Sequence, residues 1–434
     1  MNVLILGSGG REHALAWAMT RSSALSRLMC APGNPGTARI AESFSLDPSD
    51  GDGVAALCRS EDVDLVVIGP EAPLVAGVAD RLRADGVAVL GPGAAGAQLE
   101  GSKVHAKELM RAEGVPTARS AVVGSVAEAV KALDYVGKRC VVKADGLAAG
   151  KGVLMAPGRD EAVAAVRACV EERRFGDAGR RVVIEEWLEG EEVSLLALVD
   201  GEEIRPFVGS QDHKRAHDGD RGLNTGGMGA YAPFPGLTGA ALDEAVRSCV
   251  APIAGGLARR GVEYRGVLYA GLMLTADGPK VLEYNVRFGD PETQAVLPLT
   301  GGDLLDAFAA CARGELAGTP PLRMRGEAAL TVVAAAEGYP GEYRKGDVIE
   351  GVSTEDDRGD ALVFHAGTAR GPNGGIVTNG GRVLAVTGLG SSLAAARDAA
   401  YGTLDTIRFE GMSHRSDIGA RALTLAQTPE REKA

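Results

Sequence analysis

Two lysines stand in a glycine-rich stretch, Val141 to Gly152, which reads VVKADGLAAGKG. Lys143 ends a β-branched run, and Lys151 lies in the loop that follows. Glycines lack the Cβ that would keep a backbone away from a ligand, so their N–H groups can turn towards an anion. The residues therefore favour a polyphosphate ligand. The Gly-Lys-Ser/Thr ending of a Walker A motif is missing, and a flexible hairpin with solvated lysines stays open as the alternative.

A second group with chemical potential lies in KVLEYN, Lys280 to Asn285. Alternate residues of a strand share a face, so Glu283 and Asn285 should point the same way, and Arg287 should join them if the extension persists. Two oxygen ligands beside a guanidinium suit a Mg²⁺ ion that holds phosphate oxygens. An ordinary polar strand face with one ion pair is the alternative.

The amino-terminal stretch also predicts an anion site. NVLIL, from Asn2 to Leu6, has the character of a strand buried on both faces, and GSGGREH follows from Gly7. A strand, a glycine turn and a helix place backbone N–H groups where phosphate binds readily. The dinucleotide fingerprint GxGxxG fails at Glu12, which disfavours a nicotinamide cofactor and leaves a generic phosphate or sugar site. A tight turn without a ligand stays open.

Glu71 follows a second clear strand, VDLVVI, and a third strand, VAVL, ends at Leu90. In open parallel sheets, ligands collect beyond the carboxyl ends of the strands. Glu71 and the turn at Gly9 to Glu12 could therefore face one crevice. An ordinary acid at the start of a helix is the alternative for Glu71.

A weaker signal lies in the acidic stretch EEWLEGEEVS, which continues a strand over 182–184. A nucleotide base needs one donor and one acceptor side by side. The carbonyl of Glu186 and the N–H of Leu188 could supply them, with Glu192 near the ribose hydroxyls. A solvated acidic loop is the alternative.

The segment SQDHKR, residues 210–215, is interpreted as a loop in which Lys214 is the candidate for contacting substrate. His213 and His217 have the i, i+4 spacing of a zinc site on a helix, but no acid completes an HExxH motif. Zinc stays a remote alternative.

Periodicity outlines the elements that must position these residues. Near the carboxyl end, Gly380 and Gly381 predict a tight turn, from which Arg382 could meet a phosphate or cap a strand. Residues after about Ala422 look frayed. The patterns predict helices over 101–113, 160–172 and 393–407, and strands over 328–336 and 383–387.

Composition narrows the class of protein. The 434 residues suggest about three domains of roughly 150 residues each. The formal net charge of −12 disfavours a nucleic-acid partner, which requires a basic face. No charged-then-apolar amino-terminal signal and no membrane-length apolar run is present, so we expect a cytoplasmic protein without a membrane partner. The six cysteines lie far apart, which disfavours a disulfide framework and a zinc ribbon.

Together these motifs resemble the phosphoribosylamine–glycine ligase family of the ATP-grasp superfamily, in the same order and over essentially the whole chain. The motifs that carry the resemblance are GSGGREHALA, APGNPGTA, GPEAPL, GSK, VVKADGLAAGKG, SQDHKR, NTGGMGAY, EYNVRFGDPETQ and TNGGRV. The resemblance implies an enzyme of purine biosynthesis that joins glycine to 5-phosphoribosylamine. ATP would be converted to ADP and phosphate through a glycyl phosphate intermediate.

The implied fold is α/β, with α+β character in the ATP-grasp part. It consists of an amino-terminal open parallel sheet domain over 1–101, an ATP-grasp domain over 102–322 with a movable lid at about 116–187, a small carboxy-terminal α/β domain over 323–426, and a frayed tail over 427–434.

The family pattern also implies residue roles. Mg²⁺ or Mn²⁺ is the implied cofactor, and ATP is a co-substrate. Arg287, Lys214 and Lys151 would be catalytic; Lys103, Lys143, Lys151, Glu185, Glu186, Leu188 and Glu192 would bind ATP; Glu283 and Asn285 would hold the metal; and Gly9, Gly10, Arg11, Glu12, Glu71, Asp290 and Arg382 would surround phosphoribosylamine. The glycine loop from Gly146 to Gly152 would close over the phosphates as a lid.

One departure from the broader superfamily concerns the metal. Many members carry another acidic ligand on the strand before Glu-x-Asn, where this chain has Gly271. The resemblance implies that the family shares this departure, so that either another group or water would complete the metal shell.

Other classes remain to be weighed. They are a nicotinamide-dependent oxidoreductase, a non-catalytic nucleotide-binding protein, and an ATP-grasp ligase or carboxylase for a different purine intermediate. We expect a monomer that binds ATP, glycine and 5-phosphoribosylamine. Transient contact with neighbouring enzymes of the pathway is compatible with this expectation.

Overall fold

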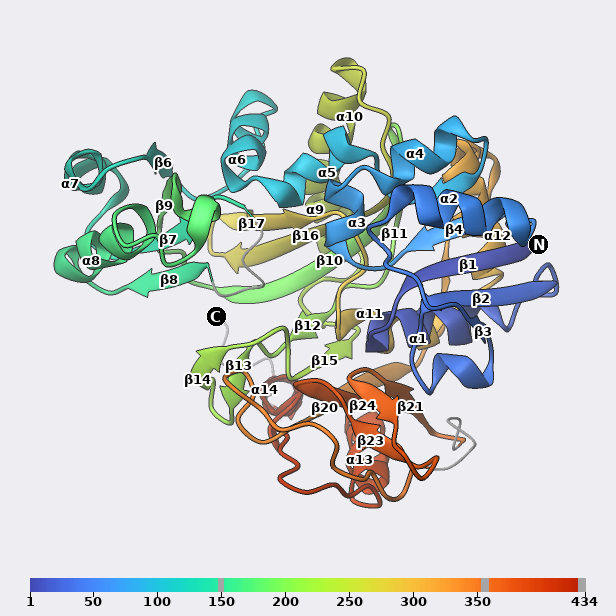
Figure 1. The fold of residues 1–434 in the computed structure, drawn as a ribbon. Helices are drawn as coiled ribbons and strands as arrows, with labels where there is room; N and C mark the ends of the chain where they lie inside the picture. Colours follow the sequence, from blue (N-terminus) through green and yellow to red (C-terminus); the bar gives the residue numbers. More distant parts are fainter. Residues whose placement is uncertain (147–151, 353–358, 428–434) are drawn as a thin grey trace.

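The computed structural model describes residues 1–146, 152–352 and 359–427 (Figure 1). Its larger sheets define four lobes, named here for their place in the chain. The N lobe holds β1–β5, the lid lobe β6–β9, the central lobe β10, β11, β16 and β17, and the C lobe β20, β21 and β24. Figure 1 shows the lid lobe projecting on one side, with the C lobe below the other three.

The N lobe is an open parallel sheet in the order β3-β2-β1-β4-β5, as predicted. Its middle strand is β1, whose apolar run from Val3 to Leu6 is fully buried because helices cover both faces of the sheet. The sequence prediction missed β2 and β3. The elements are β1 (Asn2–Gly7), α1 (Gly10–Met19), β2 (Arg27–Pro32), β3 (Glu42–Ser43), α2 (Gly51–Ser60), β4 (Leu65–Ile68), α3 (Glu71–Val75), α4 (Val78–Ala84), β5 (Ala88–Leu90) and α5 (Ala94–Gly101).

The helix predicted over 101–113 is wrong at its start, because α5 ends at Gly101 and a new helix, α6 (Lys103–Ala112), begins after Ser102. Ser102 is the N-cap of α6, and its hydroxyl accepts a hydrogen bond from the His105 N–H at 3.1 Å. Serine favours this position because its side chain satisfies a helix N–H that has no partner within the helix. The break places Lys103 at the first turn of α6.

The lid lobe is a small antiparallel sheet in the order β6-β9-β7-β8, packed on two helices. It has an apolar core of its own, which includes Leu133, Val142, Val166 and Ile184. A separate core lets such a unit move as a body relative to its neighbours. The elements are β6 (Ser120–Val123), α7 (Val126–Val136), β7 (Cys140–Ala144), β8 (Val153–Ala156), α8 (Arg159–Val170) and β9 (Val182–Glu186).

The central lobe is an antiparallel sheet in the order β11-β10-β16-β17. Its long strands pair along their length, and a bulge lies in the β16–β17 pair next to Gly271, which faces Glu283. The elements are β10 (Glu191–Asp200), β11 (Glu203–Pro206), α9 (Ala240–Ala245), α10 (Ala251–Arg259), β16 (Arg265–Thr275), β17 (Gly278–Asn285), α11 (Glu292–Val296), α12 (Leu304–Arg313), and the short pair β18 (Thr300–Gly301) and β19 (Arg323–Met324).

The C lobe sheet runs β12-β15-β20-β24-β21 and so takes in two strands from the segment before it. The predicted loop over 210–215 is therefore wrong, because β12 (Gln211–Asp212) and β13 (Arg215–His217) pair with β15 (Gly229–Ala232) and β14 (Arg221–Asn224). The other strands are β20 (Ala328–Ala335), β21 (Ala361–His365), β22 (Thr368–Arg370), β23 (Ile376–Thr378) and β24 (Arg382–Gly390).

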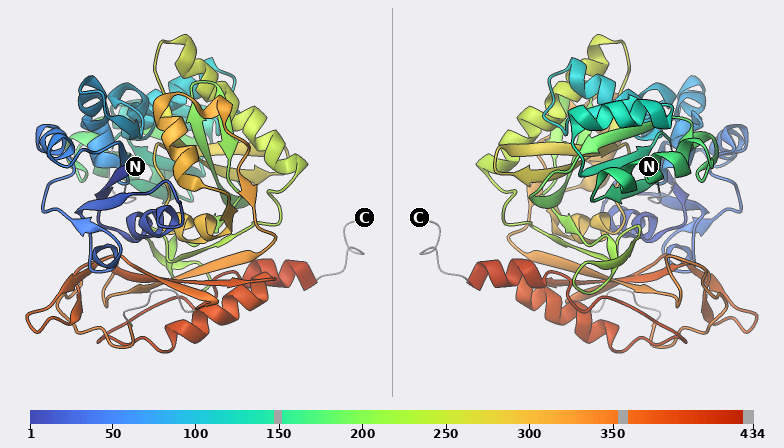
Figure 2. Two further views of the ribbon diagram at one scale, coloured as in Figure 1. Left: turned by 90° about the vertical axis from the view of Figure 1, so that its right-hand side faces the viewer. Right: turned by 90° about the vertical axis from the view of Figure 1, so that its left-hand side faces the viewer.

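Two helices complete the C lobe. Helix α13 (Leu393–Leu404) lies along the outer face of the sheet, away from the rest of the molecule (Figure 2). Helix α14 (Ala420–Gln427) continues through the segment after Ala422 where fraying was expected, so that expectation was wrong up to residue 427. The predicted tail beyond it lies outside the described residues.

All six cysteines are buried and free. In the described ranges, we find no helix with the length and apolar character needed to span a membrane.

Candidate active site

Lys143 and Glu185 lie on the same face of the lid sheet, because the register pairs Lys143 with Val183 and Val141 with Glu185. This face is opposite the one that carries the lid core. The Lys143 Nζ is 3.2 Å from Glu185 Oε2, and it donates a hydrogen bond to the Leu282 carbonyl at 2.8 Å. Since Leu282 belongs to β17, this lysine joins the lid lobe to the central lobe.

A further lysine, Lys107 of α6, completes this buried cluster. Its Nζ is also 3.2 Å from Glu185 Oε2, and it donates to the Thr117 hydroxyl at 2.7 Å. Burial, together with the nearby Lys143, lowers the pKa of Lys107 to about 8 despite the favourable effect of Glu185. One carboxylate thus faces two ammonium groups. Such a cluster has positive charge left over for an anion such as a phosphate.

Lys103 lies at the edge of the glycine-rich stretch. Its Nζ donates to the Gly146 carbonyl at 3.2 Å. Asp145, in the same stretch, accepts from the Ser102 hydroxyl at 2.8 Å and from the Val104 N–H at 3.2 Å, which ties the stretch to the start of α6. Lys151 and most of the predicted lid loop lie outside the described residues.

The predicted base edge follows the last residue of β9, Glu186. The Glu186 carboxylate forms an ion pair with Arg119 at 2.6 Å and also accepts from the Arg119 backbone N–H. The side chain is therefore held by the lid lobe itself. The hydrogen bonds expected from the Glu186 carbonyl and the Leu188 N–H to a base remain predictions.

Glu283 and Asn285 do share a face of β17, because Tyr284 between them points into the core. Burial alone would raise the pKa of the Glu283 carboxyl, but Lys214, Lys143 and other cations outweigh it and hold the pKa below its ordinary value. Glu283 is therefore ionised at neutral pH. An ionised carboxylate and an amide oxygen on one face are donors that suit Mg²⁺.

Arg287 lies beside this face, as predicted. Its Nη2 donates to the Asn285 side-chain oxygen at 3.2 Å and to Glu100 Oε1 at 3.0 Å. Its Nε lies 3.7 Å from Glu71 Oε2. The guanidinium thus stands between the predicted metal ligands and two acids of the N lobe.

Lys214 forms an ion pair with Glu192 of β10. Burial would lower the pKa of Lys214, but Glu192 and Asp212 raise it well above its ordinary value, so the ammonium stays charged. The residue therefore brings a positive charge close to Glu283, as its predicted contact with substrate requires.

The remote zinc alternative is wrong for the described residues, in which no group of three or more His, Cys, Asp or Glu side chains could hold a metal ion. His213 is buried, and its Nε2 accepts from the Gly419 N–H at 3.4 Å, whereas His217 is exposed. The spacing does not place both rings on one helix, because His213 follows β12 and His217 is the last residue of β13.

The turn at the start of α1 folds around Glu12. Its carboxylate accepts from the Gly9 N–H and from Arg11 Nε, each at 2.6 Å, and the residue is only 1% exposed. A Cβ on Gly69 would lie 2.0 Å from Glu12 Oε1, and one on Gly7 would lie 2.7 Å from its carboxyl carbon. Glu12 therefore shapes the turn from inside.

Asp290 joins three lobes. One carboxylate oxygen accepts from the Arg11 backbone N–H at 3.2 Å, and the other lies 3.4 Å from Arg382 Nη1. Arg382 also donates to the carbonyls of Asp290 at 2.6 Å and Gly226 at 2.7 Å. Burial would raise the pKa of Asp290, but Arg382 and Arg11 hold it below its ordinary value. The structure thus brings together the residues predicted to surround phosphoribosylamine.

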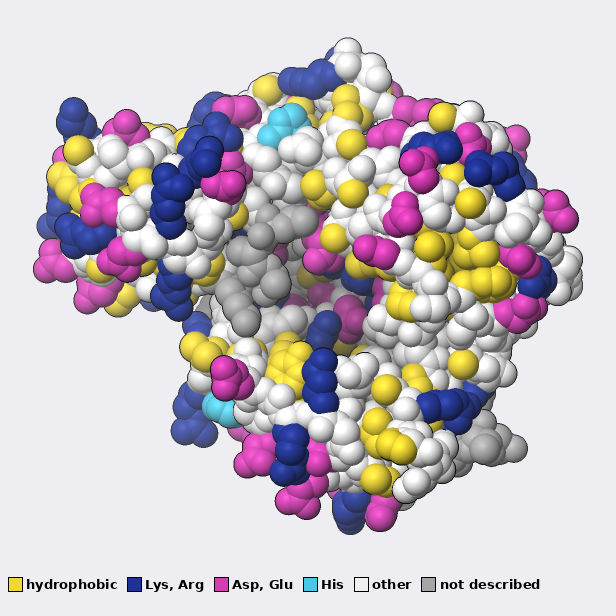
Figure 3. Space-filling model, viewed as in Figure 1, with side chains coloured by type: hydrophobic (Ala, Val, Ile, Leu, Met, Phe, Trp, Pro, Cys, Tyr) yellow, Lys and Arg dark blue, Asp and Glu magenta, His cyan; other side chains and the backbone are white. Residues whose placement is uncertain are grey.

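The sequence analysis missed two charged residues of this region. Glu100 was assigned only as the end of the first domain, and Lys107 only as a helix residue. Their positions next to the GSK motif could have indicated them. Glu100 directly precedes the motif, and Lys107 lies one helical turn after Lys103. Figure 3 shows charged side chains of both signs in the hollow between the lobes.

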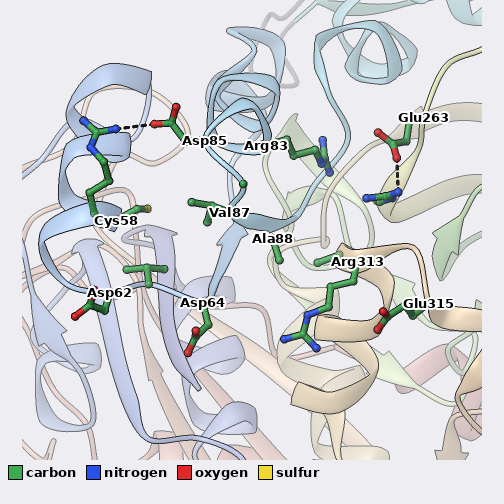
Figure 4. Close-up of a pocket in the computed structure, with 15 residues that line it drawn as sticks. Cys58, Asp62, Asp64, Arg83, Asp85, Val87, Ala88, Glu263, Arg313 and Glu315 are labelled. Atoms are coloured by element: carbon green, nitrogen blue, oxygen red, sulfur yellow. Dashed lines mark hydrogen bonds and ion pairs between the residues drawn. The ribbon is translucent and has the colours of Figure 1, made fainter.

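A different hollow lies at the amino ends of β4 and β5 (Figure 4). Asp64 and Val87, just before these strands, line it together with Arg313, the last residue of α12, and Glu315. Its charged groups largely neutralise one another, as in the Arg59–Asp85 ion pair at 2.6 Å. Ligands of open parallel sheets gather at the carboxyl ends, so we do not place the active site here.

Comparison with known proteins decides the family. Models of the phosphoribosylglycinamide synthetase N domain, ATP-grasp (A) domain and C domain match residues 1–100, 101–293 and 329–421. The chain belongs to the phosphoribosylglycinamide synthetase family. This confirms the resemblance and the fold expected from it, and it excludes the oxidoreductase and the non-catalytic alternatives. The chain is an ATP-grasp ligase.

Curated relatives match this chain over nearly its whole length. The phosphoribosylamine–glycine ligase of Caulobacter vibrioides is 50% identical over 98% of this chain and 99% of its own length. The phosphoribosylamine–glycine ligase of Halalkalibacterium halodurans is 47% identical over 98% of this chain and 97% of its own length.

Solved structures agree. The phosphoribosylamine–glycine ligase of Thermotoga maritima has a TM-score of 0.84 at 36% identity, over 96% of this chain and 100% of that one. A second solved structure is the biotin carboxylase domain of Hydrogenobacter thermophilus 2-oxoglutarate carboxylase in complex with MgADP. It has a TM-score of 0.73 over 95% of this chain and 91% of that one. Its sequence is 16% identical, so this likeness concerns the fold alone.

Proposed function

We propose that this family member joins glycine to 5-phosphoribosylamine in purine biosynthesis and converts ATP to ADP and phosphate. The observation that carries the proposal is the ionised Glu283, which lies among Lys214, Lys143, Lys103 and Arg287. This arrangement suits a metal-bound polyphosphate next to a second anionic group. The meeting point of Asp290 with Arg11 and Arg382 adds a place for a phosphorylated sugar.

The reaction proceeds in two steps. A carboxylate oxygen of glycine attacks the γ-phosphorus of ATP, the bond to the β-phosphate oxygen breaks, and ADP leaves. The amine of phosphoribosylamine then attacks the acyl carbon of glycyl phosphate, loses a proton, and expels phosphate. A carboxylate nucleophile is already ionised, so no general base is needed in the first step. Catalysis therefore depends on positioning and charge neutralisation.

The residues take the following parts. Lys103 and Lys143 bind the ATP phosphates, with Lys151 in the loop that closes over them and excludes water from the acyl phosphate. Glu185 to Leu188 bind the adenine, and Glu192 binds the ribose. Arg287 and Lys214 stabilise the charge that develops on the transferred phosphoryl group.

Glu283 and Asn285 would hold a magnesium or manganese ion, and their oxygen atoms fit such an ion. When bound, the ion supplies charge neutralisation at the phosphates.

Phosphoribosylamine binds between the N lobe and the C lobe. Arg11, Glu71, Asp290 and Arg382 line its site, together with the backbone at Gly9 and Gly10. The buried Glu12 shapes this turn rather than touching the substrate. The proposal also includes a monomeric cytoplasmic enzyme that can meet neighbouring enzymes of the pathway transiently.

ADP release measured with Mg²⁺-ATP tests the proposal, with glycine and freshly generated phosphoribosylamine omitted in turn. We expect release to need both and glycinamide ribonucleotide to accumulate. Failure of either small molecule to stimulate release would overturn the substrate assignment. Stimulation by another purine intermediate and its carboxylate partner would point to the nearest alternative within the superfamily.

A further inference from the structure

Glu100 bridges the N lobe and the metal-ligand strand with both of its carboxylate oxygens. It lies in α5, is only 9% exposed, and reaches the residues that follow β17. Oε2 accepts a hydrogen bond from the Val286 backbone N–H at 2.8 Å, and Oε1 accepts one from Arg287 Nη2 at 3.0 Å. One side chain thus holds the backbone and the guanidinium of two consecutive residues. Charge-assisted hydrogen bonds of this kind are stronger than neutral ones.

The other contacts of Arg287 constrain its guanidinium less firmly. Nη1 donates to the neighbouring Phe288 carbonyl at 3.2 Å, and Nε is 3.7 Å from Glu71, beyond hydrogen-bond distance. Asn285 accepts from the same Nη2 at 3.2 Å, but its oxygen is also the predicted metal ligand. Glu100 is therefore the partner that can keep Arg287 in place while Asn285 serves another role.

The charge balance supports the pairing. Burial raises the pKa of Glu100, while Arg287 opposes that rise. The guanidinium in turn is kept protonated by Glu100 and Glu71 in spite of its burial. If the charge of Glu100 were removed, the buried guanidinium of Arg287 would lose its strongest partner. The guanidinium would then shift its position.

We infer that Glu100 is a positioning residue for ligation, which fixes Arg287 and the end of β17 in the geometry that phosphoryl transfer needs without touching substrate. The inference rests on the role proposed above for Arg287. Small displacements of a positioned group can cost about 10²-fold in rate. The N lobe thus supplies the acid that sets the geometry of the phosphoryl-transfer site.

The test compares Glu100→Gln with the matched control Glu113→Gln. Glu113 also contacts arginines, Arg259 and Arg260, and its side chain is 10% exposed against 8% for Glu100. It joins the end of α6 to the end of α10. We expect Glu100→Gln to lower kcat by about 10- to 100-fold with little change in the KM for ATP, as a displaced group would. Glu113→Gln should retain kcat.

A double-mutant cycle separates positioning from general folding. If Glu100 acts through Arg287, Glu100→Gln should slow the Arg287→Ala enzyme no further. Additive losses in the double variant would overturn the inference, as would a kcat for Glu100→Gln equal to that of Glu113→Gln. If Glu100→Gln fails to fold, Glu100→Asp takes its place in the same cycle. Normal turnover of Arg287→Ala alone would instead refute the proposed role of Arg287.

Discussion

Replacing Gly271 with aspartate should make the stability of the enzyme depend on magnesium. Gly271 faces Glu283 across the β16–β17 pair, and a Cβ built on it lies 3.5 Å from Glu283 Cγ, which is ordinary van der Waals contact. The backbone there has no left-handed conformation that would exclude a side chain. An aspartate therefore fits, and its carboxylate comes to stand beside that of Glu283.

The size of the effect follows from this geometry. Two carboxylates roughly 5 Å apart repel by about 3 kcal/mol at an effective dielectric constant of about 20. The lysines around Glu283 reduce this cost, so we expect Gly271→Asp to lose about 1–3 kcal/mol of unfolding free energy in the absence of metal. A divalent cation bound between the two carboxylates would replace the repulsion by attraction and stabilise the folded state.

Thermal unfolding with EDTA and with magnesium chloride measures this effect, with Gly271→Asn as the uncharged control of the same shape. Without metal, Gly271→Asp should melt below Gly271→Asn, and magnesium should close or reverse the gap. A gap that magnesium leaves unchanged would refute the assignment of Glu283 as a metal ligand.

Two more predictions concern buried charges. Lys107 has a pKa of about 8 in the folded state, against 10.5 for the ordinary side chain. Between pH 8 and pH 10.5 the side chain is therefore neutral in the folded protein but protonated in the unfolded chain, so unfolding takes up a proton. The unfolding free energy of the wild type relative to Lys107→Met should therefore rise by up to about 1.4 kcal/mol per pH unit from pH 8 to 10.5. Denaturant titrations should show this slope, and a flat difference would contradict the lowered pKa. Gly69→Ala should lose about 3 kcal/mol, because its Cβ would overlap Glu12. Gly375→Ala, at a site open to solvent, should lose far less, and equal melting of the two variants would show that Glu12 can move aside.

Local pattern was enough for two elements that the site depends on. The strand before Gly7 and the alternation of Glu283 and Asn285 were predicted correctly, because hydrophobic runs and strand period are properties of neighbouring residues. Short strands were missed. The strands β12 and β13 were interpreted as a loop, because segments of two or three residues are too short to show a hydrophobic period. Their extended conformation comes from pairing with β15 and β14.

The sequence by itself determined the family, the order of the lobes and the residue types at each motif, since these depend on which residues stand next to one another. Only the tertiary structure decided how the charges pair. Val286 and Glu100 are 186 residues apart in the chain, and Lys143 and Leu282 are 139 apart, yet each pair shares a hydrogen bond. Glu12 turns inward because Gly7 and Gly69 leave it room. Such contacts form when separate elements pack together and bury their polar groups, which must then find partners, and a local pattern does not specify which partner each will find.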